Sequence, residues 1–239
     1  WVGWEYSSLR NESCDVPSIQ GCPTDAEFNY FITANRPVVI SGCMDNSVVR
    51  RLTQRPEIID HHGKDIVLLS SSNTHSHEKR QMAFHDYVEM IANGALSDSD
   101  SCDARSTWYM FGDNDHKGWK DVFEAYRSPP VAGAPTSLGT SFGIGGDGSG
   151  VNFHIHGHVF AEVLHGMKRW FLLEPGFTPP LYDPDQTSLA WYNLYQKREI
   201  FDPNLIHCSI IPGDVLYIPD RYLHATLNVG ETVFMSVFL

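Results

Sequence analysis

The second half of the chain is dense in short segments that have the composition of β-strands. Between Ser141 and Leu239 we find about eight of them, rich in aromatic and β-branched residues and separated by Gly, Pro and Asp turns. Strands at this close spacing predict a closed barrel or a sandwich, interrupted by one helix near SLAWYNLYQ. The segments are SFGIGG, VNFHIH, VFAEVLH, KRWFLLE, IHCSII, DVLYIP, HATLNV and TVFMSVFL.

The first half of the chain alternates helical and extended patterns instead. TDAEFNYFITA has the signature of a helix that begins with a capping box, because Thr24 is followed three residues later by Glu27. Further helices are expected at SVVRRLT, FHDYVEMIANG and WKDVFEAYR, and further strands at RPVVISG, DIVLLSSS and STWYMFGDN.

A polar stretch marks the passage from the first pattern to the second. Residues Ser97 to Arg105 include too few apolar side chains to pack, so we expect an exposed loop there. The stretch is too short to be a clear linker. We therefore expect a single domain over residues 1–239, with a mixed α/β part at 1–105 and the strands of the barrel core at 106–239.

The overall charge excludes one class of partner. The chain carries 29 acidic and 17 basic residues, which gives a formal net charge of -12, and its basic residues form no run longer than a Lys-Arg pair. Such a surface repels a nucleic-acid backbone, so we expect no nucleic-acid partner. No stretch approaches the ~20 apolar residues that are needed to cross a bilayer, and we expect no membrane span in this chain.

The cysteines give a clue to the compartment. Cys14 and Cys22 bracket a short loop that contains Pro and Gly, and a disulfide between them would close it; two unpaired surface thiols are the alternative. Asn11 begins an Asn-Glu-Ser sequon, which is a glycosylation site only in the secretory pathway. Three cysteines remain, so at least one is free or paired with another chain: Cys43, Cys102 and Cys208.

Two histidines at alternate positions are the strongest sign of chemistry. Side chains two residues apart on a strand point to the same face, so His154 and His156 in VNFHIH would present both imidazoles together. A metal needs a third ligand, for which His224 in the segment GDVLYIPDRYLHATLN is the best candidate. Without that partner, two histidines on a strand are more often surface or core residues.

The two histidine segments together resemble the two motifs of the cupin barrels. Within that superfamily, the run Gly-Met-Lys-Arg-Trp at 166–170 and the run Gly-Asp-Val-Leu-Tyr-Ile-Pro at 213–219 resemble the jumonji-C (JmjC) oxygenases. TWYMFGDN, TSFGIGGDGSGVNFH and SLAWYNLY resemble one subfamily of these proteins, so the resemblance spans nearly the whole chain. The cupin positions are Gly148, His154, His156, Gly213, Pro219, His224 and Asn228.

The resemblance implies a mainly β fold with flanking helices, built as a double-stranded β-helix, the jelly-roll or cupin barrel. It implies that His154 and His224 hold Fe(II), and that Lys168 binds the distal carboxylate of 2-oxoglutarate. Burying the charged side chain of a Lys inside a barrel costs free energy unless it pairs with an anion, which supports this role. The alternative is that Lys168 points outward as part of a solvated Lys-Arg pair. Tyr109 falls where related oxygenases place a tyrosine against the same carboxylate, although an aromatic packed under the barrel would look the same.

The sequence departs from the family's catalytic pattern at one ligand. Relatives have a carboxylate two residues after the first histidine, and here that residue is His156. Three neutral imidazoles suit Zn, Ni, Cu or Fe alike, so the divalent metal is left open. Glu162 is the nearest downstream carboxylate and is a candidate replacement ligand or second-shell partner of an imidazole. Val151 stands where some relatives use a hydroxyl side chain to help bind the co-substrate.

These observations support two functions of different classes. The first is a metal-binding protein of the Fe(II)/2-oxoglutarate-dependent oxygenase class that hydroxylates side chains of a protein substrate in the lumen of the endoplasmic reticulum, and that is not a histone demethylase. The second is an inactive pseudo-enzyme whose barrel binds partner proteins. A zinc-dependent hydrolase or lyase is a third reading, and it leaves Lys168 unexplained.

Overall fold

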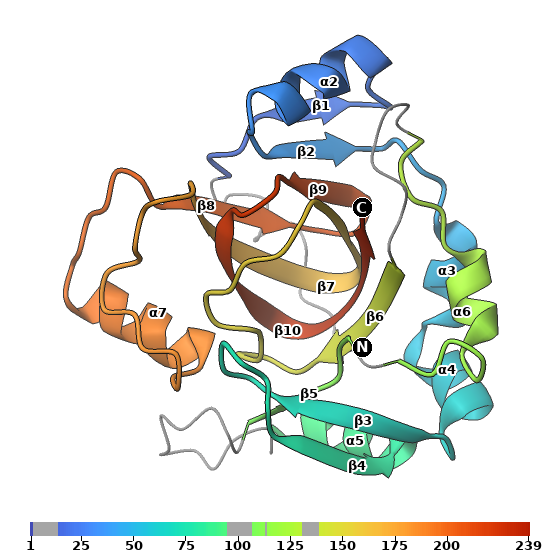
Figure 1. Cartoon of the computed structure of the whole chain (residues 1–239). Helices are drawn as coiled ribbons and strands as arrows, with labels where there is room; N and C mark the ends of the chain where they lie inside the picture. The colour runs from blue at the N-terminus through green and yellow to red at the C-terminus, as the bar shows by residue number, and fades with distance from the viewer. Residues whose placement is uncertain (2–13, 95–106, 113, 131–138) are drawn as a thin grey trace.

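The computed structural model describes residues 1, 14–94, 107–112, 114–130 and 139–239, and within these ranges the chain is mainly β with flanking helices. The larger sheet has seven strands in the order β1-β2-β9-β7-β10-β6, with β8 paired to β7 outside this path. Figure 1 shows β6, β7, β9 and β10 curving around a common interior, as in a jelly-roll. Among the described residues the path ends at β1 and β6, so the sheet curls without closing into a barrel. Its strands are β1 (Ser18–Gln20), β2 (Val38–Ser41), β6 (Gly139–Gly145), β7 (Val159–Leu173), β8 (Ile206–Ile210), β9 (Asp214–Ile218) and β10 (Leu223–Phe238).

A second, three-stranded sheet and the six helices of the described ranges surround the curved sheet (Figure 1). The capping box predicted at the first of these helices is present, since Thr24 accepts from the backbone N–H of Glu27 and the Glu27 carboxylate accepts from the backbone N–H of Thr24. The smaller sheet consists of β3 (Ile66–Ser71), β4 (Lys79–Ala83) and β5 (Trp108–Tyr109); the helices are α2 (Asp25–Thr33), α3 (Ser47–Leu52), α4 (Arg55–His62), α5 (Phe84–Ala92), α6 (Lys120–Ala125) and α7 (Ser188–Lys197). No helix in the described part of the chain is long and apolar enough to cross a membrane.

Two pairs of short strands expected from the sequence prove to be two long strands. VFAEVLH and KRWFLLE are both parts of β7, and HATLNV and TVFMSVFL are both parts of β10. Each long strand bends at a glycine instead of stopping. Gly166 has a φ of +81°, and a Cβ on it would lie 2.3 Å from the carbonyl oxygen of Glu231. Only glycine allows β7 and β10 to cross this closely. The turn signals in the sequence had divided each of these strands into two.

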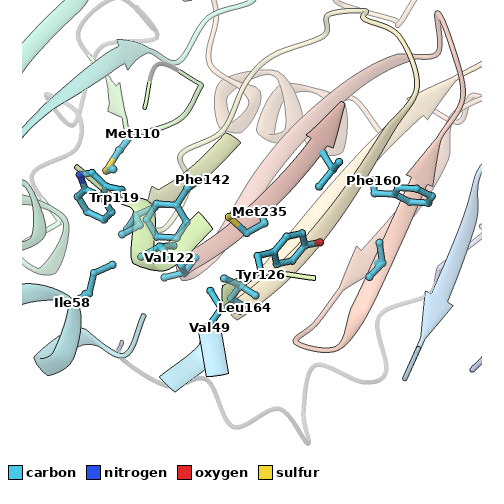
Figure 2. Packing of buried hydrophobic residues seen from close by; sticks show 14 of the residues in the cluster. Val49, Ile58, Met110, Trp119, Val122, Tyr126, Phe142, Phe160, Leu164 and Met235 are labelled. Carbon is cyan, nitrogen blue, oxygen red and sulfur yellow. The ribbon is translucent and has the colours of Figure 1, made fainter. Parts of the chain in front are cut away.

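Side chains alternate between the two faces of the curved sheet. Phe160 and Leu164 of β7 both belong to the main hydrophobic cluster (Figure 2). The ring of Phe160 packs against those of Phe28 and Tyr217, with centroids 5.5 Å apart in each pair. The intervening residues of β7 face the interior, where Val159, Ala161 and Val163 pack with residues of β8 and β9. The helices therefore cover the outer face, and the inner face is left to line a cavity.

The disulfide predicted between Cys14 and Cys22 is wrong. Cys14 is instead bonded to Cys208 on β8. Residues 14 and 22 cannot meet, because β1 is an extended strand that holds the two ends of the segment apart. The backbone N–H of Asp15 donates to the carbonyl of His207 at 2.8 Å, and this contact places Cys14 beside Cys208.

The second disulfide follows from the pairing of β1 with β2. These strands are parallel and end with Gln20 opposite Ser41, so Cys22 and Cys43, each two residues beyond the end of its strand, also come together. Two disulfides are typical of an oxidising, secretory-type environment. The fifth cysteine, Cys102, and the sequon at Asn11 lie outside the described residues.

We predict that peptide mapping without reduction will recover Cys14 linked to Cys208, and Cys22 linked to Cys43. The double variant Cys14→Ser/Cys208→Ser should lose more unfolding free energy in urea than Cys22→Ser/Cys43→Ser, because the first bond closes a span of 194 residues and the second a span of 21. The chain-entropy relation gives about 5 kcal/mol for the first and about 3 kcal/mol for the second. A peptide that joins Cys14 to Cys22 would contradict the structure.

Candidate metal centre

A pair of backbone hydrogen bonds brings the first and third histidines together. The N–H of His154 donates to the carbonyl of His224, and the N–H of His224 donates to the carbonyl of His154, both at 3.0 Å. This reciprocal antiparallel bridge places the two imidazoles side by side, with ring centroids 4.2 Å apart. The bridge is the only strand-like feature of VNFHIH, which was expected to be a full strand.

His156 completes a cluster of three imidazoles. Its Nε2 atom lies 3.0 Å from Nε2 of His224, although the segment around it is a loop. One nitrogen from each of His154, His156 and His224 lies within 4.8 Å of the others, and this is the only such group of potential metal ligands in the described ranges. The three histidines that the sequence singled out thus share one place.

The tautomer of each ring is fixed by a backbone carbonyl. Nδ1 of each histidine lies 2.8 Å from a carbonyl oxygen: that of Asn152 for His154, of Gly157 for His156 and of Tyr222 for His224. A carbonyl only accepts, so each Nδ1 carries the hydrogen and each Nε2 has a free lone pair.

The Nε2 lone pairs of the three imidazoles lie close together, with no hydrogen atom between them. Burial lowers the pKa of His154 to about 4, and burial also lowers the pKa of His156 and of His224. Neutral rings with Nδ1 protonated leave two acceptor nitrogens, those of His156 and His224, in contact. A shared metal cation removes this conflict, and the hydrogen bonds at Nδ1 are those that orient imidazole ligands in metal sites.

Lys168 lies in the same cavity, at the bottom of the inner face. The cavity has a volume of about 210 Å³ and is lined by the three histidines together with Lys168, Tyr109, Trp170 and other mostly apolar residues. Lys168 is only 2% exposed and points inward, so the alternative of a solvated outward Lys is wrong. Burial lowers the pKa of its ammonium well below the usual value.

Two side chains hold the Lys168 ammonium in position. It donates to the hydroxyl of Tyr109 at 2.6 Å and to Oδ1 of Asn228 at 2.9 Å. Tyr109 therefore reaches the Lys168 end of the cavity from β5, as the sequence predicted. Asn228 is buried within β10, opposite Lys168 in the register, and the cupin spacing was its only signal in the sequence.

Thr226 is a further cavity residue that the sequence reasoning missed. Its Oγ1 accepts from the backbone N–H of Val151 at 3.0 Å, and both residues line the cavity. The hydroxyl of Thr226 on β10 therefore lies beside Val151, the residue that stands where some relatives have a hydroxyl side chain.

Glu162 does not belong to the site. It lies on the outer face of β7, where its carboxylate accepts from Nδ2 of Asn46 at 2.7 Å and pairs with Arg50 at 3.5 Å. The expectation that it replaces a ligand or orients an imidazole is wrong. Glu162 shares its face with Phe160 and Leu164, and the register between β7 and β10 shifts after Val163, so the later even-numbered residues Lys168 and Trp170 face the cavity instead. Burial raises the pKa of Glu162 to about 7.

The other histidine pairs form no site among the described residues. His62 is buried against Trp119, with ring centroids 4.2 Å apart, and contacts the carboxylates of Asp65 and Asp121. His75 and His77 only stack on each other, at 5.2 Å.

Comparison with known proteins agrees with this architecture. The Cupin-like domain family matches residues 24–238. JmjC domain-containing protein 8 of Rattus norvegicus is 39% identical over 238 residues, which covers 100% of this chain and 87% of the relative. The protein of the same name from Homo sapiens is 41% identical over 218 residues, which covers 90% of this chain and 80% of the relative.

The fold and the histidine cluster are those of a cupin-like protein. The chain belongs to the JmjC family of cupin-like proteins, in the group of the JmjC domain-containing proteins 8. A more distant relative is Lysine-specific demethylase JMJ21 of Arabidopsis thaliana, 22% identical over 242 residues, which covers 88% of this chain and 24% of that protein. The resemblance seen in the sequence is confirmed.

We predict that Glu162 makes the stability of the fold depend on pH. Its pKa in the folded chain, about 7, lies above the ordinary value of 4.5, so its stabilising effect is complete below pH 4.5 and is lost as the pH rises through 7. Glu162→Gln should therefore gain unfolding free energy relative to wild type between pH 4.5 and pH 8 in urea titrations. Glu124→Gln, at an exposed position on α6, is the matched control and should show no such trend. Parallel curves for wild type and Glu162→Gln would contradict the prediction.

Proposed function

We propose that the chain is an Fe(II)- and 2-oxoglutarate-dependent oxygenase that hydroxylates a side chain of a protein substrate. One observation carries the proposal: a buried ammonium, with no acidic partner among the described residues, shares one cavity with three convergent Nε2 atoms. A cation site and an anion site that share a small cavity suit a chelating carboxylate ligand better than a purely structural metal.

The residues present fit both groups. His154, His156 and His224 would hold the metal, since each has a free Nε2 and a backbone-bonded Nδ1. Lys168 would bind the distal carboxylate of the oxo acid through a charge-assisted hydrogen bond. When bound, the metal would let O2 oxidise both substrates, so that 2-oxoglutarate would lose CO2 and take up one oxygen atom to give succinate, and the other oxygen atom would hydroxylate a C–H bond of the protein substrate.

The protein's own residues act by positioning and by excluding water. Tyr109 and Asn228 fix the direction of the Lys168 ammonium, and the Phe234 ring, 3.9 Å from Nζ, shields it. Because the wall is apolar, the electrostatic attraction between Lys168 and a bound carboxylate is stronger there than in water.

The disulfides and the net charge support a proposal for the cellular compartment and the substrate class. The two disulfides favour the secretory pathway, and we propose the lumen of the endoplasmic reticulum, with Asn11 as a glycosylation site. The net charge of -12 disfavours chromatin, so we propose a protein substrate other than a histone.

One observation favours a competing function. The ligand at position 156 is a neutral imidazole where family members with catalytic activity carry a carboxylate, which leaves the centre with a higher positive charge. The competing proposal is a pseudo-enzyme that keeps the fold and metal and binds a partner protein. If turnover appears only in His156→Asp, the wild-type chain is the pseudo-enzyme; if wild type forms succinate, the competing function fails.

We predict that anaerobic addition of Fe(II) and then 2-oxoglutarate to the intact protein will produce a metal-to-ligand charge-transfer band. Lys168→Met should weaken 2-oxoglutarate binding by about 10- to 100-fold, the usual value of a lost hydrogen bond to a charged group. Lys64→Met removes an exposed lysine and should leave the titration unchanged. A wild-type protein that binds Fe(II) but gives no band and no 2-oxoglutarate affinity would contradict the proposal.

A further inference from the structure

The loop that carries His156 lacks the support that the other two histidines have. His154 and His224 fix each other through their reciprocal backbone bridge, whereas His156 lies beyond this bridge in a loop whose surface is open to solvent. Ile155 is 58% exposed, and Gly157 is exposed as well. A cation attracts a neutral imidazole less strongly than a carboxylate, so the position of His156 depends on how its loop is anchored.

The first anchor is the turn between β9 and β10. The backbone N–H of Arg221 in this turn donates to the carbonyl of His156 at 3.0 Å. Arg221 has a φ of +59°, a left-handed conformation that residues other than glycine rarely adopt. Its side chain is 76% exposed, so packing in the core does not impose this conformation. The strained backbone brings an N–H group to the His156 loop.

The second anchor is the imidazole of His158. Its Nδ1 atom lies 2.8 Å from the hydroxyl of Tyr217 on β9, and the backbone N–H of Asp220 donates to the same nitrogen at 3.2 Å. Because a backbone N–H can only donate, Nδ1 is an acceptor, the Tyr217 hydroxyl also donates to it, and the ring hydrogen lies on Nε2. The carbonyl of His158 accepts from the N–H of Leu239 at 3.0 Å. His158 therefore links the loop to β9, to the turn and to the residue that follows β10.

The tautomer of His158 is opposite to that of the three candidate ligands. In those rings Nδ1 carries the hydrogen, whereas in His158 the lone pair of Nδ1 faces two donors. His158 does not belong to the group of convergent nitrogen atoms. Its ring lies nearly parallel to that of Tyr217, which is fully buried and packs against Phe28 with centroids 4.8 Å apart. The imidazole of His158 thus connects the exposed loop to a rigid part of the core.

We propose that His158 is the positioning residue of His156. By accepting from the buried hydroxyl of Tyr217, it holds the loop so that Nε2 of His156 stays beside the other two candidate ligands. The inference rests on the proposed function, since it needs a metal on the three histidines. It goes beyond that function because it assigns a role to His158 and explains how a loop supplies the third ligand.

The proposal is tested by the affinity of the intact protein for Zn(II), measured by competition with a chromophoric chelator. His158→Leu should weaken Zn(II) binding by about 10- to 100-fold, the usual effect of losing a group that orients a metal ligand. His158→Asn is the conservative variant and should keep most of the affinity, because its side-chain oxygen can accept the same hydrogen bonds. Tyr217→Phe removes the donor and keeps the buried ring, so it should weaken Zn(II) binding in the same direction even if His158→Leu does not fold.

A double-mutant cycle separates positioning from a general loss of stability. In the His156→Ala background, His158→Leu should cause no further loss of Zn(II) affinity, because it acts through a ligand that is already absent. The visible spectrum of Co(II)-loaded His158→Leu should match that of Co(II)-loaded His156→Ala, since two histidines bind the metal in each.

Equal losses from His158→Leu in both backgrounds, or a loss in His158→Asn as large as that in His158→Leu, would overturn the inference and leave the proposed function intact. Unchanged Zn(II) affinity in both His158→Leu and Tyr217→Phe would do the same. Failure of the wild-type protein to bind either Zn(II) or Co(II) would instead overturn the proposed function.

Discussion

The pairing of β7 with β10 is the interaction on which the rest of the site depends. Its register sets Lys168 opposite Asn228 and His224 opposite Leu172, on strands that run the length of the curved sheet. The same strand β10 begins beside the bridge to His154, so the ammonium and the imidazoles are placed by one continuous ladder of hydrogen bonds. Gly166 allows the two strands to cross closely without breaking, because any side chain there would collide with the backbone of β10.

The electrostatic character of the cavity follows from this geometry. The register shift between β7 and β10 after Val163 turns Lys168 inward although Glu162, at an even position earlier on the strand, points outward, so the one buried carboxylate of β7 contacts Asn46 and Arg50, away from the histidines. The inner face is left with lone pairs at the histidines and a hydrogen-bond donor at Lys168. These buried polar groups contribute little to the stability of the fold. Their presence is explained instead by the ligands that they would bind.

The sequence predicted those features that depend on local pattern or on motif spacing. The capping box at Thr24, the jelly-roll class and the convergence of His154, His156 and His224 could be read in this way. The disulfide partners could not, since Cys14 meets Cys208 only through the pairing of segments far apart in the chain. Helix α4 has too little apolar periodicity to be recognised, and the outward direction of Glu162 depends on where the bends of β7 fall.

The central claim is that three histidines, each held by a backbone carbonyl, form one metal centre. X-ray absorption at the metal edge of the protein loaded with one equivalent of Zn(II) tests it most directly. The account predicts the multiple-scattering pattern of three imidazoles at the Zn–N distance of about 2.0–2.1 Å, and its loss in His224→Ala. A spectrum with one imidazole or none, or one that His224→Ala leaves unchanged, would contradict the account.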